Sequence, residues 1–271
     1  VCAPLQGRIA IKLHTGEPHG PNILPRDMVR ALQARIPGST IVECNVLYPS
    51  PRQTTEGHRE TLRTNGWTFC PVDIMDAEGE VSLPVKGGRH LRENFVGSHY
   101  PAYDFTVVLS HFKGHAMGGF GGAVKNISIG IASSAGKAWI HSAGKTKNAA
   151  EMWSALPPQD DFLESMAEAA KAVADHCGER ILYINVMNNL SVDCDCDAHP
   201  AAPEMGDIGI LASTDPVALD KACVDLVYAS DDPGKVHLIE RIESRRGTHT
   251  LDHAAAIGLG NPDYELIDID N

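Results

Sequence analysis

The sequence contains no apolar run of the roughly 18 residues that a membrane-spanning helix needs. It also lacks an excess of basic residues: 23 of its 271 residues are Lys or Arg and 35 are Asp or Glu, a formal net charge of -12. Because proteins that bind nucleic acid present a basic surface to the phosphates, we expect no nucleic-acid partner. The first residues, VCAPLQGRIAIKLH, do not combine a basic region with an apolar stretch. We therefore expect a soluble, cytoplasmic protein with no membrane association.

Cysteine is scarce and scattered. Of the seven cysteines, five are far from one another in the sequence: Cys2, Cys44, Cys70, Cys177 and Cys223. This is a poor disulfide framework for a chain of this length. The general nucleotide-binding motifs are also absent, because the glycine-rich segment holds neither GK[ST] nor GxGxxG in the required register. Only Cys194 and Cys196 form a cluster.

Apolar residues make up 43% of the chain, which suffices for a sizeable core, and β-rich runs alternate with helical patterns. The predicted strands are residues 8–13, 40–47, 67–72, 105–109, 180–186 and 264–269. The predicted helices are residues 25–36, 54–65, 160–177, 215–229, 235–245 and 250–257. Residues 73–101 carry turn signals and predict a hairpin or excursion. The alternation predicts an α/β fold, with a mostly parallel sheet and helices on both faces.

The polar segment 145–160, with two adjacent prolines, predicts a boundary within the chain. We expect residues 1–145 to form an N-terminal α/β part and residues 146–271 a C-terminal α/β part packed on it. These form either two lobes or one continuous domain. Open α/β sheets bind ligands in the crevice at the carboxyl ends of their strands, so we expect the site there.

The segment SHFKGHAMGGFGGAVKN, residues 110–126, follows the strongest strand signal, FTVVL. Glycines between a buried strand and a helix let the backbone turn tightly and bring its amides close to an anion or cofactor. The predicted cofactor-binding residues are Gly118, Gly119, Gly121, Gly122, Lys125 and Asn126. The alternative is a loop in which the glycines only solve a packing problem.

Side chains with proton and metal chemistry accompany these glycines. His111 and His115 lie where the strand ends, and we expect them to move protons or bind a metal. Lys125 lies near the start of the next helix, where burial would lower its pKa and make its amine a better nucleophile. His141 follows in GKAWIHSAGK and is a metal ligand or an ordinary surface or core histidine.

Several motifs resemble the family called domain of unknown function 362, whose members are often labelled Fe-S centre proteins. They are the glycine-rich segment extended to SHFKGHAMGGFGGAVKNISIGIASSAGKAWIHS, KLHTGE, LYPSPRQTTEGH, MNNLSVDCDCDAHP and DIGILASTDPVALDKA. Many members carry two four-cysteine ferredoxin motifs after the position that matches His141. Residues 141–161 hold no cysteine here, so the resemblance implies no ferredoxin-type cluster.

The middle segment is also similar to the signature of nickel-pincer lactate racemases. In that signature a histidine precedes a GxxGG-like turn, a lysine follows it, and another histidine lies further on; His115, Lys125 and His141 match this order. The resemblance implies that Lys125 carries a tethered pyridinium-type nucleotide. It further implies that His141 ligates the metal and that His115 acts as acid and base.

Two positions depart from the racemase pattern. The first loop offers His14 and Glu17 where the racemases hold their cofactor with Asp and Arg, and Pro51 stands where they have a second acid/base histidine. A symmetric racemase needs two opposed proton acceptors, so racemisation itself is not implied. What the resemblance implies is the scaffold with a cofactor or metal site, in which His14 contributes to cofactor binding.

The acidic turn SVDCDCDAHP gathers two thiols, carboxylates and an imidazole. Cys194 and Cys196 can reach one metal, but two thiolates do not complete a tetrahedral site, so distant histidines such as His141 would be needed. Soft thiolates with imidazole suit nickel, iron or zinc rather than magnesium. The alternative is an acidic turn with two free thiols.

These features lead to hypotheses of different classes. The first is an enzyme, either an oxidoreductase or an isomerase, that uses a metal or a lysine-tethered cofactor for proton or hydride transfer on a small anionic, hydroxy-acid-like substrate. The second is a non-catalytic metal-binding or redox accessory protein with a redox partner. A third is a metabolite-binding domain without chemistry. Self-association into a homo-oligomer is compatible with each.

Overall fold

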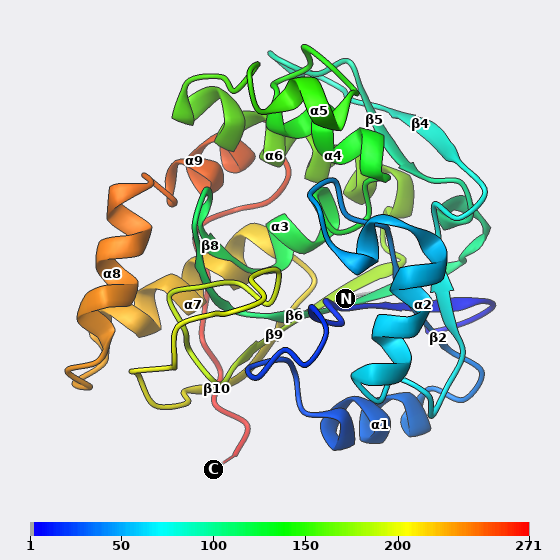
Figure 1. Ribbon diagram of the computed structural model, residues 1–271. Helices are drawn as coiled ribbons and strands as arrows, with labels where there is room; N and C mark the ends of the chain where they lie inside the picture. Colours follow the sequence, from blue (N-terminus) through cyan, green and yellow to red (C-terminus); the bar gives the residue numbers. More distant parts are fainter. Residues whose placement is uncertain (1–2, 271) are drawn as a thin grey trace.

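The computed structural model describes residues 3–270, and its central feature is a six-stranded sheet with the strand order β10-β9-β6-β1-β2-β3. Neighbouring strands are parallel except β9 and β10, which pair antiparallel. The strands of this sheet are β1 (Ile9–Lys12), β2 (Thr40–Glu43), β3 (Val72–Ile74), β6 (Phe105–His111), β9 (Ile181–Met187) and β10 (Gly209–Ser213). The predicted α/β fold with a mostly parallel sheet is confirmed (Figure 1).

Two hairpins lie outside this sheet. The first, β4 (Glu80–Pro84) with β5 (Glu93–Gly97), occupies the segment predicted as a hairpin or excursion. The second, β7 (Lys113–His115) with β8 (Gly119–Gly121), is formed by the glycine-rich segment directly after β6. The glycine-rich segment is therefore a short, hydrogen-bonded hairpin rather than an open loop.

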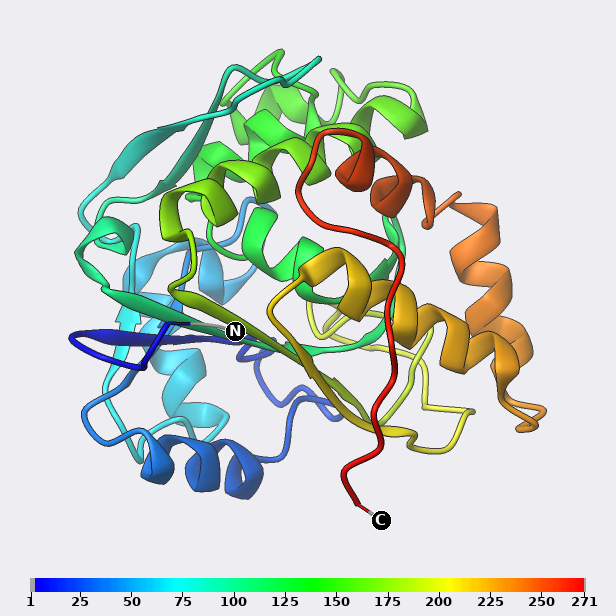
Figure 2. The same ribbon diagram turned by 180° about the vertical axis from the view of Figure 1, so that it is seen from behind.

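Helices cover both faces of the sheet. Within residues 3–270 they are α1 (Arg26–Arg35), α2 (Thr55–Thr64), α3 (Ala123–Ser128), α4 (Ser134–His141), α5 (Ala149–Met152), α6 (Gln159–Cys177), α7 (Pro216–Ala229), α8 (Lys235–Ser244) and α9 (His249–Ala256), with 3-10 turns at Pro51–Gln53 and Tyr100–Ala102. Figures 1 and 2 show α1 on one face, and α3, α6 and α7 on the other. As predicted, Asp215 caps α7 by accepting from two backbone N–H groups.

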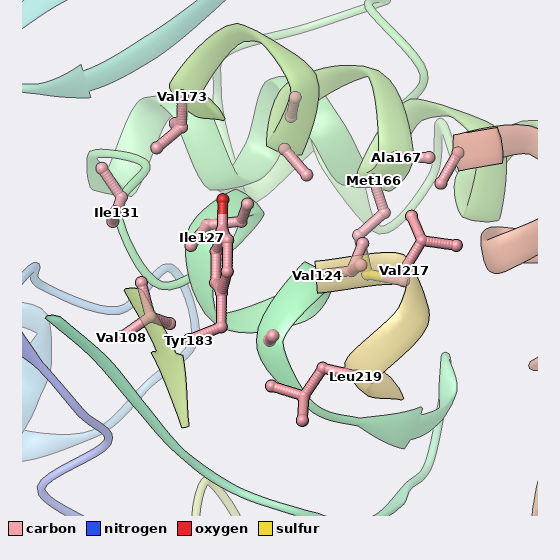
Figure 3. Packing of buried hydrophobic residues seen from close by; sticks show 14 of the residues in the cluster. Val108, Val124, Ile127, Ile131, Met166, Ala167, Val173, Tyr183, Val217 and Leu219 are labelled. Atoms are coloured by element: carbon pink, nitrogen blue, oxygen red, sulfur yellow. The ribbon is translucent and has the colours of Figure 1, made fainter. Parts of the chain in front are cut away.

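The two faces bury separate apolar clusters because side chains alternate along each strand. In β6, Val107 belongs to the cluster under α1, whereas Val108 belongs to the cluster under α3, α6 and α7. Figure 3 shows part of the second cluster, in which these residues face one another: Val108, Val124, Ile127, Ile131, Met166, Ala167, Val173, Tyr183, Val217 and Leu219. This packing fixes α3 directly above β6 and β9.

The strand order reverses between β1 and β6. From β1 the chain proceeds to β2 and β3 on one side, and β6 is followed by β9 and β10 on the other. Such a reversal leaves a crevice at the carboxyl ends of the two central strands. The chain on both sides of residue 145 contributes to this one sheet, since β9 pairs along its length with β6.

Three predictions need correction or comment. Residues 264–269 form no strand, although their composition favours one, because the segment pairs with no strand of the sheet and leaves Ile267 and Ile269 exposed. The strand predicted at 67–72 begins only at Val72. Trp67, at the start of the predicted range, is buried outside the sheet and donates its indole N–H to the carbonyl of Thr15. Cys2 lies outside the described residues.

Within residues 3–270, no helix has the length and apolar character that crossing a bilayer requires.

Candidate functional site

A cavity of about 750 Å³ opens at the carboxyl ends of the central strands. Its wall includes the last residue of three strands: Lys12 of β1, Glu43 of β2 and His111 of β6. Most of the residues expected from the sequence also line it, namely His14, His115, Gly121, Gly122, Lys125, Asn126, His141, Cys194 and Cys196. The cavity thus brings the glycine-rich segment and the CDCD cluster into one site.

His115, Cys194 and Cys196 form the closest group of metal-ligating side chains in this cavity. One ring nitrogen of His115 and both Sγ atoms lie within 4.8 Å of one another. The glycine-rich hairpin and the cysteine loop meet because Gly114 has no side chain: a Cβ there would lie 2.2 Å from the carbonyl oxygen of Val192. The tight approach of these two backbones places the imidazole beside the thiols.

The two thiols have different protonation. A hydrogen bond with Cys196 lowers the pKa of Cys194, and the ammonium group of Lys125, 3.8 Å from the Cys194 Sγ, lowers it further against the effect of burial. The same hydrogen bond and burial raise the pKa of Cys196. Cys194 is therefore a thiolate that accepts a hydrogen bond from the S–H group of Cys196. A metal bound by both sulfurs would displace that proton.

Lys125 does not have the lowered pKa expected from its burial. Burial does favour the neutral amine, but Cys194, Cys196 and Asp195 oppose it and raise the pKa overall. The side chain is consequently a cation beside a thiolate rather than a free nucleophilic amine.

His115 and His141 present opposite hydrogen-bond patterns to the cavity. Nδ1 of His115 accepts the backbone N–H of Gly118 at 2.8 Å, so Nε2 carries the hydrogen of the neutral ring. His141 donates its Nδ1–H to the carbonyl of Lys137 at 2.7 Å and stacks on Phe162, so its Nε2 keeps a lone pair. The second pattern is typical of a metal-ligating histidine, and the first is typical of a proton donor.

Both of these rings are neutral at pH 7. Burial, and then the positive charge of Lys125, hold the pKa of His115 well below its usual range. Burial lowers the pKa of His141 to about 4. A neutral imidazole is the form that can ligate a metal or exchange a proton.

His111 is placed differently from the expected proton carrier. Its Nδ1 lies 3.0 Å from the carboxylate of Asp195 and its Nε2 lies 2.6 Å from the carbonyl oxygen of Asn188. Lys113 also forms an ion pair with Asp195. Since both ring nitrogens already have partners within the protein, His111 holds the cysteine loop against the end of β6.

A buried ion-pair network forms another wall. Glu43 contacts Lys12 at 2.9 Å and Arg52 at 3.1 Å, and Arg52 also contacts Glu17 at 3.0 Å. Burial opposes ionisation of Glu43, but Lys12 and Arg52 outweigh it and lower its pKa to about 2. Arg52 Nη1 lies 3.3 Å from Nε2 of His14, which ties this first-loop histidine to the network. Sequence reasoning missed Lys12 and Glu43, although a charged residue ending each of the apolar strands IAIK and TIVE was a usable signal.

The helix after the glycine-rich hairpin holds an anion, but that anion is part of the protein. Asp220 of α7 accepts the backbone N–H groups of Ala123 and Val124 at 2.7 and 2.9 Å. Gly122 permits this approach, because a Cβ there would lie 2.3 Å from the Asp220 carboxylate. The first two amides of α3 are therefore satisfied by Asp220 and are not free to bind a ligand.

The remaining predicted residues serve packing or support. Gly119 has a φ of +80°, and a Cβ there would lie 2.8 Å from the Cα of Gly247. Gly118 donates its backbone N–H to His115. Neither glycine lines the cavity. Asn126 does line it, and its side-chain amide donates to the carbonyl of Lys12 at 3.2 Å and to the hydroxyl of Ser110 at 3.1 Å. Asn126 therefore joins α3 to the ends of β1 and β6, where the strand order reverses.

Comparison with known proteins gives a family and several distant structures, among them the two that follow. The model of the family described as "Domain of unknown function (DUF362)" matches residues 9–225. No curated protein matches the sequence. The lactate racemase apoprotein from Thermoanaerobacterium thermosaccharolyticum is similar at 12% identity and a TM-score of 0.47, over 81% of this chain and 48% of that one. A Thermotoga maritima protein of known structure is similar at 12% identity and a TM-score of 0.41, over 93% of this chain and 55% of that one. The chain thus spans about half the length of both.

Proposed function

Because the chain belongs to the DUF362 family, whose description names no activity, we propose a function from the chemistry of the cavity. We infer a metal-dependent enzyme that acts on a small anionic substrate of the hydroxy-acid type by proton or hydride transfer. It would accordingly be an isomerase or an oxidoreductase. The observation that carries this proposal is the pair of thiols of Cys194 and Cys196 with the imidazole of His115 within 4.8 Å of both sulfurs, on the wall of a cavity of about 750 Å³. The two sulfurs would hold the metal, and the imidazole would act on a substrate beside it.

The donor set fits a transition metal. Cys194 and Cys196 share one proton that a metal would replace, and soft thiolates with imidazole suit nickel, iron or zinc. His141 has the lone-pair pattern of a ligand and lines the same cavity, so we assign it as the nitrogen ligand. A metal at this position would supply a Lewis acid for a substrate oxygen.

His115 is the proposed acid and base. It is neutral, buried and adjacent to the thiols, and its Nε2–H is oriented by the Gly118 amide on the other side of the ring. This nitrogen would hydrogen-bond the substrate hydroxyl and exchange its proton. The role requires a ring that is neutral at rest, as burial makes it.

Two lysines that line the cavity, Lys125 and Lys137, support the proposal that the substrate is an anion. Among residues 3–270, neither Lys125 nor Lys137 has a carboxylate oxygen within 4.0 Å, in contrast to Lys12 and Lys113. Lys137 donates instead to the carbonyl of Ala132 at 2.6 Å. These ammonium groups would bind a substrate carboxylate by charge-assisted hydrogen bonds. Because the Lys125 amine is held protonated, a pyridinium-type cofactor tethered to it is less favoured. The intact mass of the protein distinguishes a chain with a free Lys125 from one that carries a tethered cofactor.

One observation favours the second candidate, a metal-binding or redox accessory protein. Cys194 and Cys196 are hydrogen-bonded to each other, which is the arrangement of a dithiol that ligates a metal or is oxidised to a disulfide. Such a protein would bind the same metal without turning over a substrate. Catalysis is therefore the property that separates the two candidates.

The test is turnover of small 2-hydroxy acids in D2O by protein reconstituted with nickel, iron(II) or zinc. We expect stereochemical inversion or deuterium exchange at the hydroxyl-bearing carbon or, when an oxidised nicotinamide dinucleotide is added as hydride acceptor, oxidation to the 2-oxo acid. NMR and chiral chromatography measure these products. His115→Asn should retain the metal and lower the rate about 10²–10⁴-fold, as for loss of a general acid/base.

Two controls complete this experiment. Cys194→Ser should lose both metal and turnover, whereas Cys70→Ser, a half-exposed cysteine outside the cavity, should keep both. Metal binding at Cys194 and Cys196 without turnover would identify the accessory protein. Absence of metal binding at these cysteines would overturn the proposed enzyme.

A further inference from the structure

A second group of metal-ligating side chains lies outside the cavity, where the loop between β4 and β5 meets the N-terminal half of α6. The geometry points to a binding site for a divalent first-row transition metal such as zinc, held by His90, Asp161 and Glu164. None of these residues lines the cavity of about 750 Å³, so the site is separate from the proposed catalytic centre. The segments that form it, together with α9, gather at one end of the molecule (Figure 1).

The donor atoms have the spacing of a coordination sphere. Nε2 of His90 lies 2.7 Å from Oε2 of Glu164 and 4.0 Å from Oδ1 of Asp161, and one donor atom from each residue lies within 4.8 Å of the other two. Ligand atoms about 2.0–2.1 Å from a tetrahedral zinc ion lie roughly 3.3 Å apart. The observed distances lie on both sides of this value, so small rotations of the side chains would close the site around an ion.

Hydrogen bonds fix the loop that carries His90 against α6, which carries Asp161 and Glu164. Asp161 and Glu164 are three residues apart on α6, which places them on the same face of the helix. One turn further along, Glu168 accepts the backbone N–H groups of His90 and Leu91 at 3.0 and 2.7 Å and so fixes the loop that carries His90. The imidazole is therefore positioned over the two carboxylates by the backbone of its own loop.

Helix α9 supplies the supporting shell. Nε2 of His249 lies 3.1 Å from Oε1 of Glu164, which leaves the other oxygen, Oε2, directed at His90. One turn along α9, Nε2 of His253 lies 3.3 Å from Oε1 of Glu168. Side chains that orient a ligating carboxylate in this way are a general feature of metal sites.

The local charge also favours a cation. Three carboxylates lie within two turns of α6, those of Asp161, Glu164 and Glu168. In the described chain one Lys or Arg side chain bonds to any of them, that of Arg89, which bonds to Glu164. Arg89 is 71% exposed, whereas Glu164 is 8% exposed, so the guanidinium can move into solvent when an ion enters. A dication would offset the buried negative charge more completely than the exposed arginine does.

The experiment is a zinc titration of the full chain that carries Cys194→Ser and Cys196→Ser, after removal of metal with a chelator. In this background the cavity thiols cannot contribute, so failure of the cavity site does not affect the result. We expect one zinc per chain by calorimetry, with a rise in Tm. Glu164→Gln or His90→Ala added to this background should weaken binding at least 10-fold. Arg246→Gln, which breaks a surface pair with Asp160 one residue from the site, should not.

Zinc binding that is absent from the double-serine chain, or unchanged by Glu164→Gln, would show an ion-pair cluster only and overturn the proposal. Should the double-serine chain fail to fold, the same comparison is made in the natural sequence by total zinc content. There Glu164→Gln should reduce the total by one zinc per chain, and an unchanged total would contradict the site.

Discussion

At the scale of single residues, the cavity is built from buried charges whose partners are supplied by the protein. Glu43 shows the principle most clearly: it is 2% exposed and contacts both Lys12 and Arg52, each of them also buried. Burial of any one of these charges alone would cost several kcal/mol, and pairing offsets that cost. The network therefore positions the ends of β1 and β2 around the cavity.

We expect Glu43→Gln to lower the free energy of unfolding by about 3–5 kcal/mol at pH 7, because it leaves the buried ammonium group of Lys12 without a carboxylate, while Arg52 keeps only its pair with Glu17. Urea denaturation followed by circular dichroism measures this difference. The matched control is Glu60→Gln, whose carboxylate is 66% exposed and pairs with Arg63 on the surface of α2; it should change stability by less than about 1 kcal/mol.

The stability of the natural chain and that of Glu43→Gln should depend differently on pH. The pKa of Glu43 is about 2 in the folded protein against an ordinary value of 4.5, so its stabilising contribution is complete above pH 4.5. It is lost as the pH falls from 4.5 towards 2. The natural chain should therefore lose more stability over this interval than Glu43→Gln does, and an equal loss in both would contradict the ionised state of Glu43.

At the scale of elements, α3 depends on a cap from another helix. It begins after Gly122, which has no side chain to cap it, and Asp220 of α7 accepts its first two amides. Asn185 of β9 donates to the same carboxylate at 2.7 Å. Burial raises the pKa of Asp220 to about 6 against these hydrogen bonds. One carboxylate thus holds together α3, α7 and β9, and with them Lys125.

Asp220→Ala should lower the free energy of unfolding by about 2–3 kcal/mol at pH 7, because three buried donors lose their acceptor. The loss is limited because the ionised carboxylate is itself unfavourably buried. It should also weaken metal binding in the cavity, since Lys125 on α3 would no longer be fixed beside Cys194. Thermal denaturation and metal titration measure the two effects. Asp225→Ala, which removes a partly exposed partner of Lys221 on α7, is the control, and an equal effect of both substitutions would refute the capping role.

At the scale of the whole molecule, the sequence was sufficient to predict the architecture and the edge of the sheet that carries the site. Strand and helix patterns predicted the α/β order, and the rule for strand ends predicted that the glycine-rich segment with His115 and Lys125 lies at the crevice. Whether the turn with Cys194 and Cys196 lies in the same cavity stayed open until the structure brought the two together. These predictions rest on local periodicity and on a rule of topology, both of which a single sequence displays.

What the sequence could not supply are pairings between distant segments. The Asp220 cap joins residues far apart in the chain, so nothing near Gly122 reveals that its amides are already satisfied. The hydrogen bond between His111 and Asp195 and the raised pKa of Lys125, which depends on Cys194, Cys196 and Asp195, join segments that only the folded chain brings close. The expected strand at 264–269 is absent for a similar reason: its residue pattern is local, but a strand needs a neighbour in space.

The central claim is that Cys194 and Cys196 hold a transition metal in the cavity. The most direct measurement is X-ray absorption at the metal edge of the reconstituted protein, in a chain carrying Glu164→Gln so that the second site does not contribute. With zinc, we expect two sulfur scatterers at about 2.3 Å and nitrogen at about 2.0–2.1 Å, with the sulfur shell lost in Cys194→Ser/Cys196→Ser. A metal coordinated only by nitrogen and oxygen in the chain with both cysteines intact would contradict the account.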